Sequence, residues 1–381
     1  MERMIRLYYR DTWIEVNLDA IHKNLAFIQN KTSKNCIAVL KANAYGHGDY
    51  AIAEAVVRHG ITMVAVAYLD EAISLRLQGY IHDILVLGYV RARDLKLAKQ
   101  YQITLTVPSM LWLEETIQNE SIKNIKFHIK IDTGMNRLGI KSLDECLKVI
   151  QLLQKHEGII DGIYTHFACA DEIDNDMNQK QSELFSSIVK QCNYEFQWIH
   201  CDNSAAALTL SNSFANAVRI GIILYGTSPI EEEKNYLAPA FSLFSSITNI
   251  KYVKKGEKIG YNATYTMKQD GWIATLPIGY ADGFIRENQG RYLYIEDTPC
   301  QIVGRVCMDQ CMILCDQFYP LETKVEIIGK HVNIYEMAKE LHTIPYEVLC
   351  LFSDRIPRII KENNEVKQVI NYRLFHNEIN H

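Results

Sequence analysis

The sequence predicts an α/β protein in which an N-terminal (β/α)8 barrel of the TIM type precedes a smaller, mostly β C-terminal domain. Three observations support this fold class. Eight short strand-like runs alternate with segments of helical periodicity, and this alternation stops near residue 235. Beyond that point, strand-like pieces are joined by turns. The length of 381 residues suits one large barrel plus one smaller domain.

The eight expected barrel strands are short apolar runs. In chain order they cover residues 36–42, 63–68, 83–88, 103–107, 126–132, 162–168, 198–203 and 217–226. Most are separated by segments with helical periodicity, such as SLDECLKVIQLLQK, and DAIHKNLAFIQNK precedes the first run. Such alternation indicates parallel β/α units, and eight units close naturally into a barrel. An open doubly wound sheet is the alternative, because periodicity alone does not close a barrel.

The second domain is expected from a run of strand-like pieces in which only NIYEMAKELH has a helical pattern. The pieces are FSLFSSITNIKYVKKGEK, GWIATLPIGYADG, RYLYIEDTPCQIVGRV and KVEIIGK. We therefore place the barrel at residues 12–235 and the β domain at 236–381. The early strand TWIEVNLD, residues 12–19, is a candidate member of the β domain.

Charge and hydropathy exclude several classes of partner. The formal net charge is -5 and no dense Lys/Arg block occurs, so neither nucleic acid nor an anionic membrane surface is an expected partner. No apolar stretch is long enough for a membrane helix. The start, MERMIRLYYRDTW, lacks the apolar region of a secretory signal, so we expect a cytoplasmic protein.

Ten cysteines in a chain without a secretory signal are expected to be reduced thiols. The one cluster, VCMDQCMILC, contains Cys307, Cys311 and Cys315. Its spacing matches no paired zinc motif, so we expect these side chains to fill a strand-rich core and expect no metal site.

Chemistry-bearing residues follow several of the expected barrel strands, at the ends where barrel enzymes keep their active sites. A single residue of this kind is usually an ordinary solvated residue at the rim of the barrel. Several such residues at the corresponding ends of different strands favour an active site there. They are Lys41 after the first run, Asp132 and Arg137 at or after the fifth, His166 in the sixth, Asn203 and Ser204 after the seventh, and Arg219 and Gly221 in the eighth.

The positions of Ser204 and Gly221 suggest the cofactor. They follow the seventh and eighth strands, where barrels of this type often hold a phosphate on backbone N–H groups. Together with a lysine at a strand end, they predict pyridoxal 5'-phosphate (PLP) bound through a Schiff base to Lys41. In AVLKANAYGHG, the apolar strand desolvates and positions the amine, and the small residues after it leave room for the cofactor.

With these residues in view, the chain resembles the bacterial alanine racemases, which are fold-type III PLP enzymes. AVLKANAYGHG resembles their cofactor-lysine motif, and the other motifs follow in the family's order: KIDTGMNRLGI, YTHFA, HCDNSAA, VRIGIILYG, IGYNATYT, LPIGYADG and VGRVCMDQ. The resemblance runs from about residue 12 to about residue 360. It implies interconversion of L- and D-alanine, D-alanine supply for peptidoglycan, and a homodimer whose subunits complete each other's active sites.

The resemblance also implies two catalytic bases. Lys41 is expected to hold PLP and act as one base, and Tyr261 of the partner subunit is expected to act as the other. Removing a proton from one face of Cα and returning it to the other requires two such groups. Tyr265 lies in the same GYNATYT stretch and is the alternative tyrosine.

The cofactor contacts implied by the resemblance involve both side chains and backbone. His166 resembles the residue stacked on the ring, and Arg219 the residue that faces the ring nitrogen. Because a guanidinium only donates hydrogen bonds, the ring nitrogen stays unprotonated, and this limits side reactions such as transamination. The remaining expected cofactor contacts are Tyr45, Asn203, Ser204, Gly221 and Ile222.

The resemblance also implies which residues contact the substrate. Arg137, together with Met308 of the partner subunit, resembles the pair that receives the substrate carboxylate. Lys130 resembles a lysine that is carbamylated in many relatives and orients this arginine. Tyr280, Arg286 and Arg305 resemble residues of the substrate access channel, although ordinary β-domain surface and core are an equal alternative.

Two positions depart from the family pattern. Asp354, in LFSDRIPR, stands where relatives carry a tyrosine that touches the cofactor phosphate and narrows the substrate pocket. An aspartate there is repulsive unless it turns away or is neutralised, and it enlarges the pocket. The alternative function is therefore a serine or broad-specificity amino-acid racemase. Asp202, in HCDNSAA, replaces a smaller residue, and the sequence offers no account of it.

Three further classes are alternatives to the racemase interpretation. Decarboxylases of the same fold type pair the ring nitrogen with a carboxylate, and Arg219 argues against them. A non-catalytic PLP-binding barrel would lack the β domain. A racemase-like chain that only binds a ligand is favoured by Asp354 alone.

Overall fold

The computed structural model describes residues 8–172, 175–210 and 214–374. The first seven residues, which belong to the segment scanned for a secretory signal, and the last seven residues of the predicted β domain lie outside this range. The chain divides into two compact units. The barrel unit comprises Ala20–Ala44 and Asp49–Ala238, and the β unit comprises Met1–Asp19, Tyr45–Gly48 and Pro239–His381.

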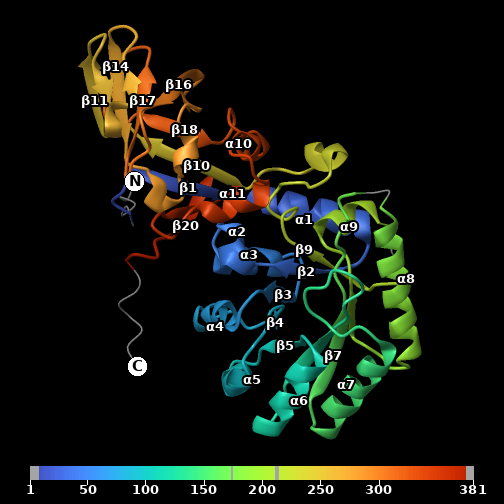
Figure 1. Cartoon of the computed structure of the whole chain (residues 1–381). Helices are drawn as coiled ribbons and strands as arrows, with labels where there is room; N and C mark the ends of the chain where they lie inside the picture. Colours follow the sequence, from blue (N-terminus) through green and yellow to red (C-terminus); the bar gives the residue numbers. More distant parts are fainter. Residues whose placement is uncertain (1–7, 173–174, 211–213, 375–381) are drawn as a thin grey trace. The chain divides into compact units, whose positions relative to one another are not determined.

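The barrel unit contains a closed barrel of parallel strands in the order β2-β3-β4-β5-β6-β7-β8-β9, which confirms the predicted strands (Figure 1). Pairing of β2 with β9, with Asn35 opposite Ala217, closes the barrel and excludes the open sheet. The strands are β2 (Asn35–Val39), β3 (Met63–Val66), β4 (Asp83–Val86), β5 (Thr104–Val107), β6 (Lys126–Lys130), β7 (Ile159–Tyr164), β8 (Trp198–His200) and β9 (Ala217–Ile220).

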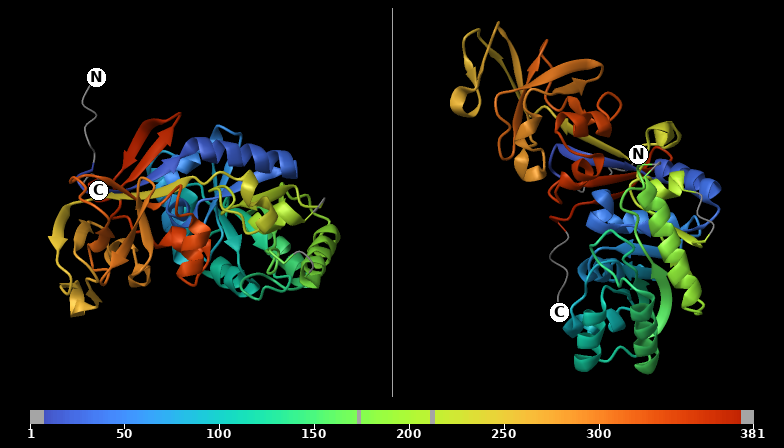
Figure 2. Two further views of the ribbon diagram at one scale, coloured as in Figure 1. Left: turned by 90° about the horizontal axis from the view of Figure 1, so that it is seen from above. Right: turned by 45° about the vertical axis from the view of Figure 1, so that its right-hand side comes forward.

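Helices surround these strands (Figure 2), and capping residues fix where several of them begin. Helix α7 starts after Ser142, whose hydroxyl accepts a hydrogen bond from the Glu145 backbone N–H at 3.2 Å. Its buried face consists of Cys146, Val149, Ile150 and Leu153. The helices are α1 (Leu18–Thr32), α3 (Asp49–Val57), α4 (Leu69–Leu77), α5 (Leu95–Gln100), α6 (Met110–Asn119), α7 (Leu143–Lys155), α8 (Asp176–Gln191) and α9 (Ser204–Thr209).

The β unit is built on a ten-stranded sheet in the order β11-β14-β17-β16-β15-β18-β10-β1-β19-β20. Strand β1 belongs to this sheet, because it pairs antiparallel with β10 and parallel with β19. The functional domain boundary between residues 235 and 236 stays a prediction. The strands are β1 (Thr12–Asn17), β10 (Phe241–Ser246), β11 (Asn249–Val253), β14 (Gly271–Leu276), β15 (Tyr292–Ile295), β16 (Thr298–Val303), β17 (Cys311–Cys315), β18 (Lys324–Ile328), β19 (Arg358–Glu362) and β20 (Glu365–Ile370).

Smaller elements complete the β unit. Strands β12 (Lys258–Ile259) and β13 (Tyr265–Thr266) form a separate two-stranded sheet. Helix α10 (Ile334–Glu340) was expected, whereas α11 (Pro345–Leu351) and the β19–β20 hairpin were not. The sequence carried a local signal for this hairpin, because asparagine tolerates the positive φ that tight hairpin turns need. The turn residues Asn363 and Asn364 have φ of 54° and 61°.

All ten cysteines are free thiols. Cys311 and Cys315 lie buried in β17, as expected of small apolar side chains in a strand-rich core, and Cys307 is partly buried in the preceding loop. No helix in the described part of the chain is long and apolar enough to cross a membrane.

Candidate active site

Positively charged side chains gather at the C-terminal ends of the barrel strands. Lys41 follows β2, Lys130 is the last residue of β6, and Arg219 lies in β9. The pKa of His166 shows that these charges lie close together. It is held well below its usual range, first by burial and then by the charges of Arg219, Lys130, Arg137 and Lys41. The barrel therefore carries a cationic cluster, consisting of Lys41, Lys130, Arg137 and Arg219, around a neutral histidine.

The chain turns sharply after Lys41. Ala42, Asn43, Ala44 and Tyr45 all have left-handed backbone angles, with φ between 52° and 55°. This conformation costs about 1–2 kcal/mol per residue for side chains with a Cβ, so the neighbouring structure must hold it. The Ala42 N–H donates to the Glu71 carboxylate at 2.6 Å, and the Asn43 side-chain oxygen accepts from the Asp49 N–H at 2.9 Å.

Arg219 is 4% exposed and has only neutral hydrogen-bond partners. Its Nη1 lies 2.7 Å from Nδ1 of His200. Its Nη2 donates to the carbonyl oxygens of Thr165 at 2.8 Å and Cys201 at 3.0 Å, and lies 3.0 Å from Nδ1 of His166. Among the described residues, the Nε–H group of Arg219 has no acceptor. The Nε–H group of this buried guanidinium is therefore available to a ligand.

A chain of buried histidines continues behind Arg219. Since Arg219 donates to Nδ1 of His200, the proton of His200 lies on Nε2, which is 2.8 Å from Nδ1 of His128. The other nitrogen of His128, Nε2, then donates to Asp161 at 3.2 Å. Burial lowers the pKa of both histidines, so both rings are neutral at neutral pH. No pattern in the sequence indicated this chain of hydrogen bonds, which fixes one tautomer at each ring.

Lys130 is buried beside other cations. Its Nζ donates to the Ile131 carbonyl oxygen at 2.9 Å and lies 5.2 Å from the ring centroid of Tyr164. Burial, followed by the charges of Arg219 and Arg137, lowers the pKa of this amine to about 7, although Asp132 acts in the opposite direction. A substantial fraction of Lys130 is therefore uncharged at neutral pH.

The turns after β8 and β9 meet at Ser204. Gly221 donates its backbone N–H to the Ser204 hydroxyl at 3.0 Å, and Ser204, Gly221 and Ile222 are all buried. Asn203 caps α9 by accepting from the Ala206 N–H at 3.0 Å. Small polar and backbone donors thus lie at the point where barrels of this type hold phosphates.

Arg137 borders a pocket of about 380 Å³ whose lining residues all belong to the barrel unit. Its loop is shaped by Asp132, whose carboxylate accepts from the N–H groups of Gly134 and Asn136, both at 3.0 Å. The pocket combines the apolar Leu111 and Trp112 with the charged Arg137 and Lys141.

The remaining predicted site residues lie in the β unit. Tyr45 is buried, with its ring centroid 6.3 Å from that of Tyr346. Tyr261 and Met308 are 69% and 54% exposed, whereas Tyr265 packs against an apolar core that includes Val253, Ile259 and Met267. Of the two tyrosines in GYNATYT, Tyr261 is therefore the more exposed.

Asp354 turns toward a buried arginine. Its carboxylate lies 3.5 Å from Nη1 of Arg358, a residue that is 0% exposed. Arg358 also donates to the carbonyl oxygens of Gly46 at 3.1 Å, Ile356 at 2.7 Å and Phe352 at 3.1 Å. The Asp354 carboxylate thus has a cationic partner in the β unit.

Asp202 also has a partner that the sequence did not reveal. It is 1% exposed, and its carboxylate lies 3.1 Å from Nζ of Lys34. The Cys201 thiol donates to its other oxygen at 3.2 Å. An ion pair between residues far apart in the sequence accounts for this departure.

Comparison with known proteins agrees with the fold and with the motifs. The family model described as "Alanine racemase, N-terminal domain" matches residues 16–229, and "Alanine racemase, C-terminal domain" matches residues 240–360. The chain belongs to the alanine racemase family, which confirms the resemblance drawn from its motifs.

Individual relatives show the same relationship along nearly the whole chain. Alanine racemase 1 of Bacillus subtilis (strain 168) is 41% identical over 375 residues, which cover 96% of both chains. The crystal structure of alanine racemase from Bacillus anthracis with bound L-Ala-P has a TM-score of 0.91 at 41% identity, covering 96% of this chain and 99% of that one. Histidine racemase from Leuconostoc mesenteroides subsp. sake has a TM-score of 0.85 at 31% identity, covering 93% and 98%.

Proposed function

We propose that this protein is a PLP-dependent alanine racemase that interconverts L- and D-alanine. The observation that carries the proposal is the cationic cluster at the end of a lysine-bearing barrel strand, in a chain whose relatives are named alanine racemases. Such a cluster suits two anions: the phosphate of the cofactor and the carboxylate of an amino acid.

The residues present fit PLP. The Ser204 hydroxyl and the backbone N–H groups of Gly221 and Ile222 suit a phosphate, with Tyr45 and Asn203 as further contacts. The Arg219 Nε–H suits an unprotonated ring nitrogen, because guanidinium groups only donate. His166 would lie against the ring, and Lys41 would hold the aldehyde carbon. When bound, PLP withdraws electrons from Cα of the amino acid and so acidifies its proton.

The side chains then move that proton. Lys41 Nζ serves one face of Cα, and the phenolic oxygen of Tyr261 of the partner subunit serves the other. One group accepts the proton while the opposite group donates one, so the configuration inverts. The exposure of Tyr261 supports this assignment, since an exposed tyrosine is available to a second subunit.

Arg137 is proposed to receive the substrate carboxylate, together with Met308 of the partner subunit. Lys130 is proposed to be carbamylated: its neutral amine attacks carbon dioxide, a C–N bond forms, and one proton leaves to solvent. The pKa of about 7 supports this step, because only the uncharged amine is nucleophilic. The resulting carbamate oxygens would accept hydrogen bonds from Arg137 and orient it.

The wider setting is proposed on the same basis. Two chains form a homodimer with shared active sites, and the product D-alanine serves peptidoglycan synthesis. Ten free thiols suit a reducing compartment, which supports the cytoplasm as the location.

The test is racemisation of L-alanine by the full chain with added PLP, followed by chiral chromatography. Wild type is expected to reach an equal mixture of both enantiomers, and Lys41→Ala to lose at least a thousandfold in rate. Lys31→Ala removes a surface lysine that pairs with Glu233 and should retain full activity. Absence of D-alanine from the wild-type reaction would refute the proposal.

A second candidate, a serine or broad-specificity racemase, is favoured by Asp354. A histidine racemase shares the fold, so a larger side chain is compatible with it. L-Alanine and L-serine should be compared in wild type and in Asp354→Tyr. If the tyrosine suppresses a serine activity that equals or exceeds alanine activity, Asp354 sets the specificity. If serine turnover is negligible in both proteins, the second candidate fails.

A further inference from the structure

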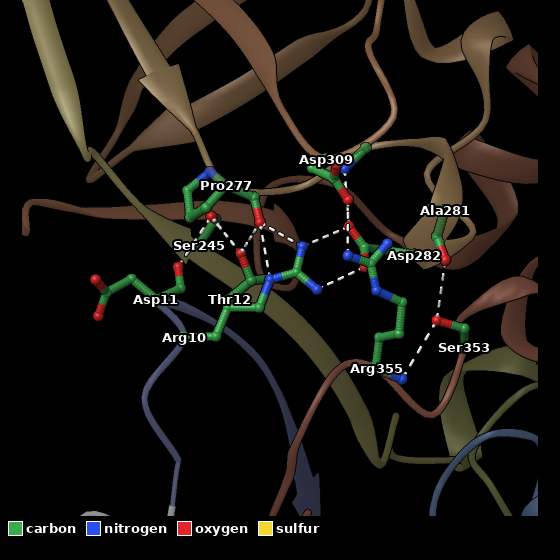
Figure 3. A network of polar contacts seen from close by, with 11 residues as sticks. Arg10, Asp11, Thr12, Ser245, Pro277, Ala281, Asp282, Asp309, Ser353 and Arg355 are labelled. Carbon is green, nitrogen blue, oxygen red and sulfur yellow. Dashed lines mark hydrogen bonds and ion pairs between the residues drawn. The ribbon is translucent and has the colours of Figure 1, made fainter. Parts of the chain in front are cut away.

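A buried aspartate in the β unit, to which the proposed mechanism gives no role, joins three segments of this unit. Asp282 ends the short 3-10 helix Tyr280–Asp282 and is 0% exposed. Its two carboxylate oxygens accept hydrogen bonds from Nη1 and Nη2 of Arg10, both at 2.5 Å (Figure 3). One of these oxygens also accepts from the Gly279 N–H at 3.0 Å.

Arg355 extends this contact to a second aspartate. Its Nη1 lies 3.5 Å from Asp282, and its Nη2 donates to Asp309 at 2.7 Å (Figure 3). The Asp309 carboxylate raises the pKa of the Arg355 guanidinium. Two arginines and two aspartates thus form a charge-balanced group, which we call the Arg355 bridge: Arg10, Asp282, Asp309 and Arg355.

The bridge spans three segments whose backbones are also bonded to one another. The N–H groups of Tyr280 and Ala281 donate to the carbonyl oxygens of Cys307 and Met308, both at 3.0 Å, and the Ser353 N–H donates to the Asp282 carbonyl oxygen at 3.0 Å. At Gly279 the approach is so close that an added Cβ would lie 2.3 Å from the Cys307 oxygen and 2.4 Å from the Met308 oxygen. The segments 279–283, 306–310 and 353–355 are therefore held together.

Each segment carries a residue related to the substrate: Met308 is proposed to meet its carboxylate, Asp354 to set the specificity of the pocket, and Tyr280 resembles a residue of the access channel. Arg355 follows Asp354 directly, and Asp309 follows Met308 directly. The Arg355–Asp309 contact therefore fixes two of these residues relative to each other. The Asp309 side chain is 54% exposed and that of Arg355 32%, so the contact itself adds little to the free energy of unfolding.

We propose that Arg355 and Asp309 are positioning residues that hold Met308, which serves the partner subunit's active site, and Asp354, which serves the chain's own site, in one register and so set the affinity of both sites for the amino-acid substrate. Asp282 anchors this pair to the buried part of the β unit. The proposal deepens the proposed function and rests on it. It assigns the bridge no part in proton transfer, so KM should respond to its loss and kcat should not.

The test uses the full-length, PLP-loaded enzyme with three variants: Asp309→Ala, Arg355→Met and the double variant. Each single change is expected to raise KM for L-alanine about tenfold with kcat nearly unchanged. Since both remove the same contact, the double variant should be no worse than either single one. Arg355→Lys, which keeps the charge but not the forked donors, should restore part of the affinity.

Glu340→Ala is the matched control, because Glu340 also pairs with a more buried arginine, Arg291, and its side chain is 55% exposed. This variant should leave KM unchanged. Additive effects in the double variant, a fall in kcat alone, or an equal rise of KM in Glu340→Ala would each overturn the proposal.

Hydrogen exchange separates failure of this proposal from failure of the proposed function. The amides of Tyr280, Ala281 and Ser353 should exchange faster in Asp309→Ala and Arg355→Met than in wild type or in Glu340→Ala. This readout does not require racemase activity. Unchanged exchange at these amides would show that the bridge does not hold the segments together.

Discussion

Arginines cluster both at the C-terminal ends of the barrel strands, which we call the barrel mouth, and in the β unit. The positive charges of the two clusters are neutralised in different ways. In the β unit, Arg10 and Arg355 contact the carboxylates of Asp282 and Asp309. At the barrel mouth, the hydrogen-bond partners of buried Arg219 are carbonyl oxygens and neutral imidazoles. Burial of unbalanced positive charge costs free energy unless an anion arrives, so the imbalance marks the ligand site and the balance marks a structural support.

Of the effects that this comparison of the two regions predicts, the largest comes from reversing one charge at the C-terminal ends of the barrel strands. In Arg219→Glu, a carboxylate replaces the donor that faces the cofactor ring, so racemisation should fall about a hundred- to a thousandfold. Pyruvate from transamination should become detectable, because the ring nitrogen then gains a proton. Both products can be measured in one incubation with L-alanine. Arg91→Glu, which changes an arginine side chain that is 59% exposed in the same unit, serves as the control. Equal activity in the two variants would contradict the comparison.

A smaller effect is expected on the rate at which activity recovers after carbon dioxide is removed and added back, because this rate depends on the protonation of Lys130. After removal of carbon dioxide, activity should recover when it is added back, because the neutral amine reforms its carbamate. With a pKa of about 7, the neutral fraction is about tenfold larger at pH 8 than at pH 6, so recovery at equal dissolved carbon dioxide should be about tenfold faster.

Lys126→Met tests whether this response belongs to Lys130, since Lys126 lies on the same strand and pairs with Asp83. That variant should keep the carbon dioxide dependence, whereas Lys130→Met should lose it. Recovery that does not vary with pH would show that Lys130 is not the responding group.

The same pKa has a consequence for stability. The pKa of about 7 in the folded chain lies below the ordinary pKa of 10.5 for a free lysine, so between these values the unfolded chain binds the proton more tightly. The contribution of Lys130 to the free energy of unfolding therefore rises as the pH increases through this range.

The smallest predicted effect is on the free energy of unfolding. It concerns the buried carboxylate of Asp202, which is paired with Lys34. Lys34→Met leaves Asp202 buried without its ammonium group and should lower the free energy of unfolding by about 1–3 kcal/mol. Urea denaturation measures this change. Adding Asp202→Ala to Lys34→Met should restore much of the loss, because the unpaired buried carboxylate is then removed. A double variant that is as unstable as Lys34→Met would show that the ion pair is not the cause.

The barrel could be predicted because its strands are short apolar runs separated by periodic helices, and closure was the one step that needed the structure. Lys41 stood out for the same reason: a charged residue ends the apolar run at 36–40. The left-handed turn after it could not be predicted, since Ala42 and Ala44 have no intrinsic preference for that conformation.

Long-range pairing limited what the sequence revealed of the site. His128 occupies an ordinary strand position, and only the fold shows its contacts with His200 and Asp161. Lys34 lies far from Asp202 in the sequence, which is why that departure had no account. By contrast, the β19–β20 hairpin carried a local signal in Asn363 and Asn364, and the dense charges around it obscured the alternation.

Borohydride reduction of the PLP-loaded enzyme tests most directly whether the barrel mouth holds the cofactor through Lys41. Reduction makes the bond between cofactor and lysine permanent, and proteolysis followed by mass spectrometry locates it. The account predicts a phosphopyridoxyl group on the peptide that contains Lys41 and on no other peptide. Attachment to a different lysine, Lys130 above all, or no attachment under conditions that support racemisation, would contradict it.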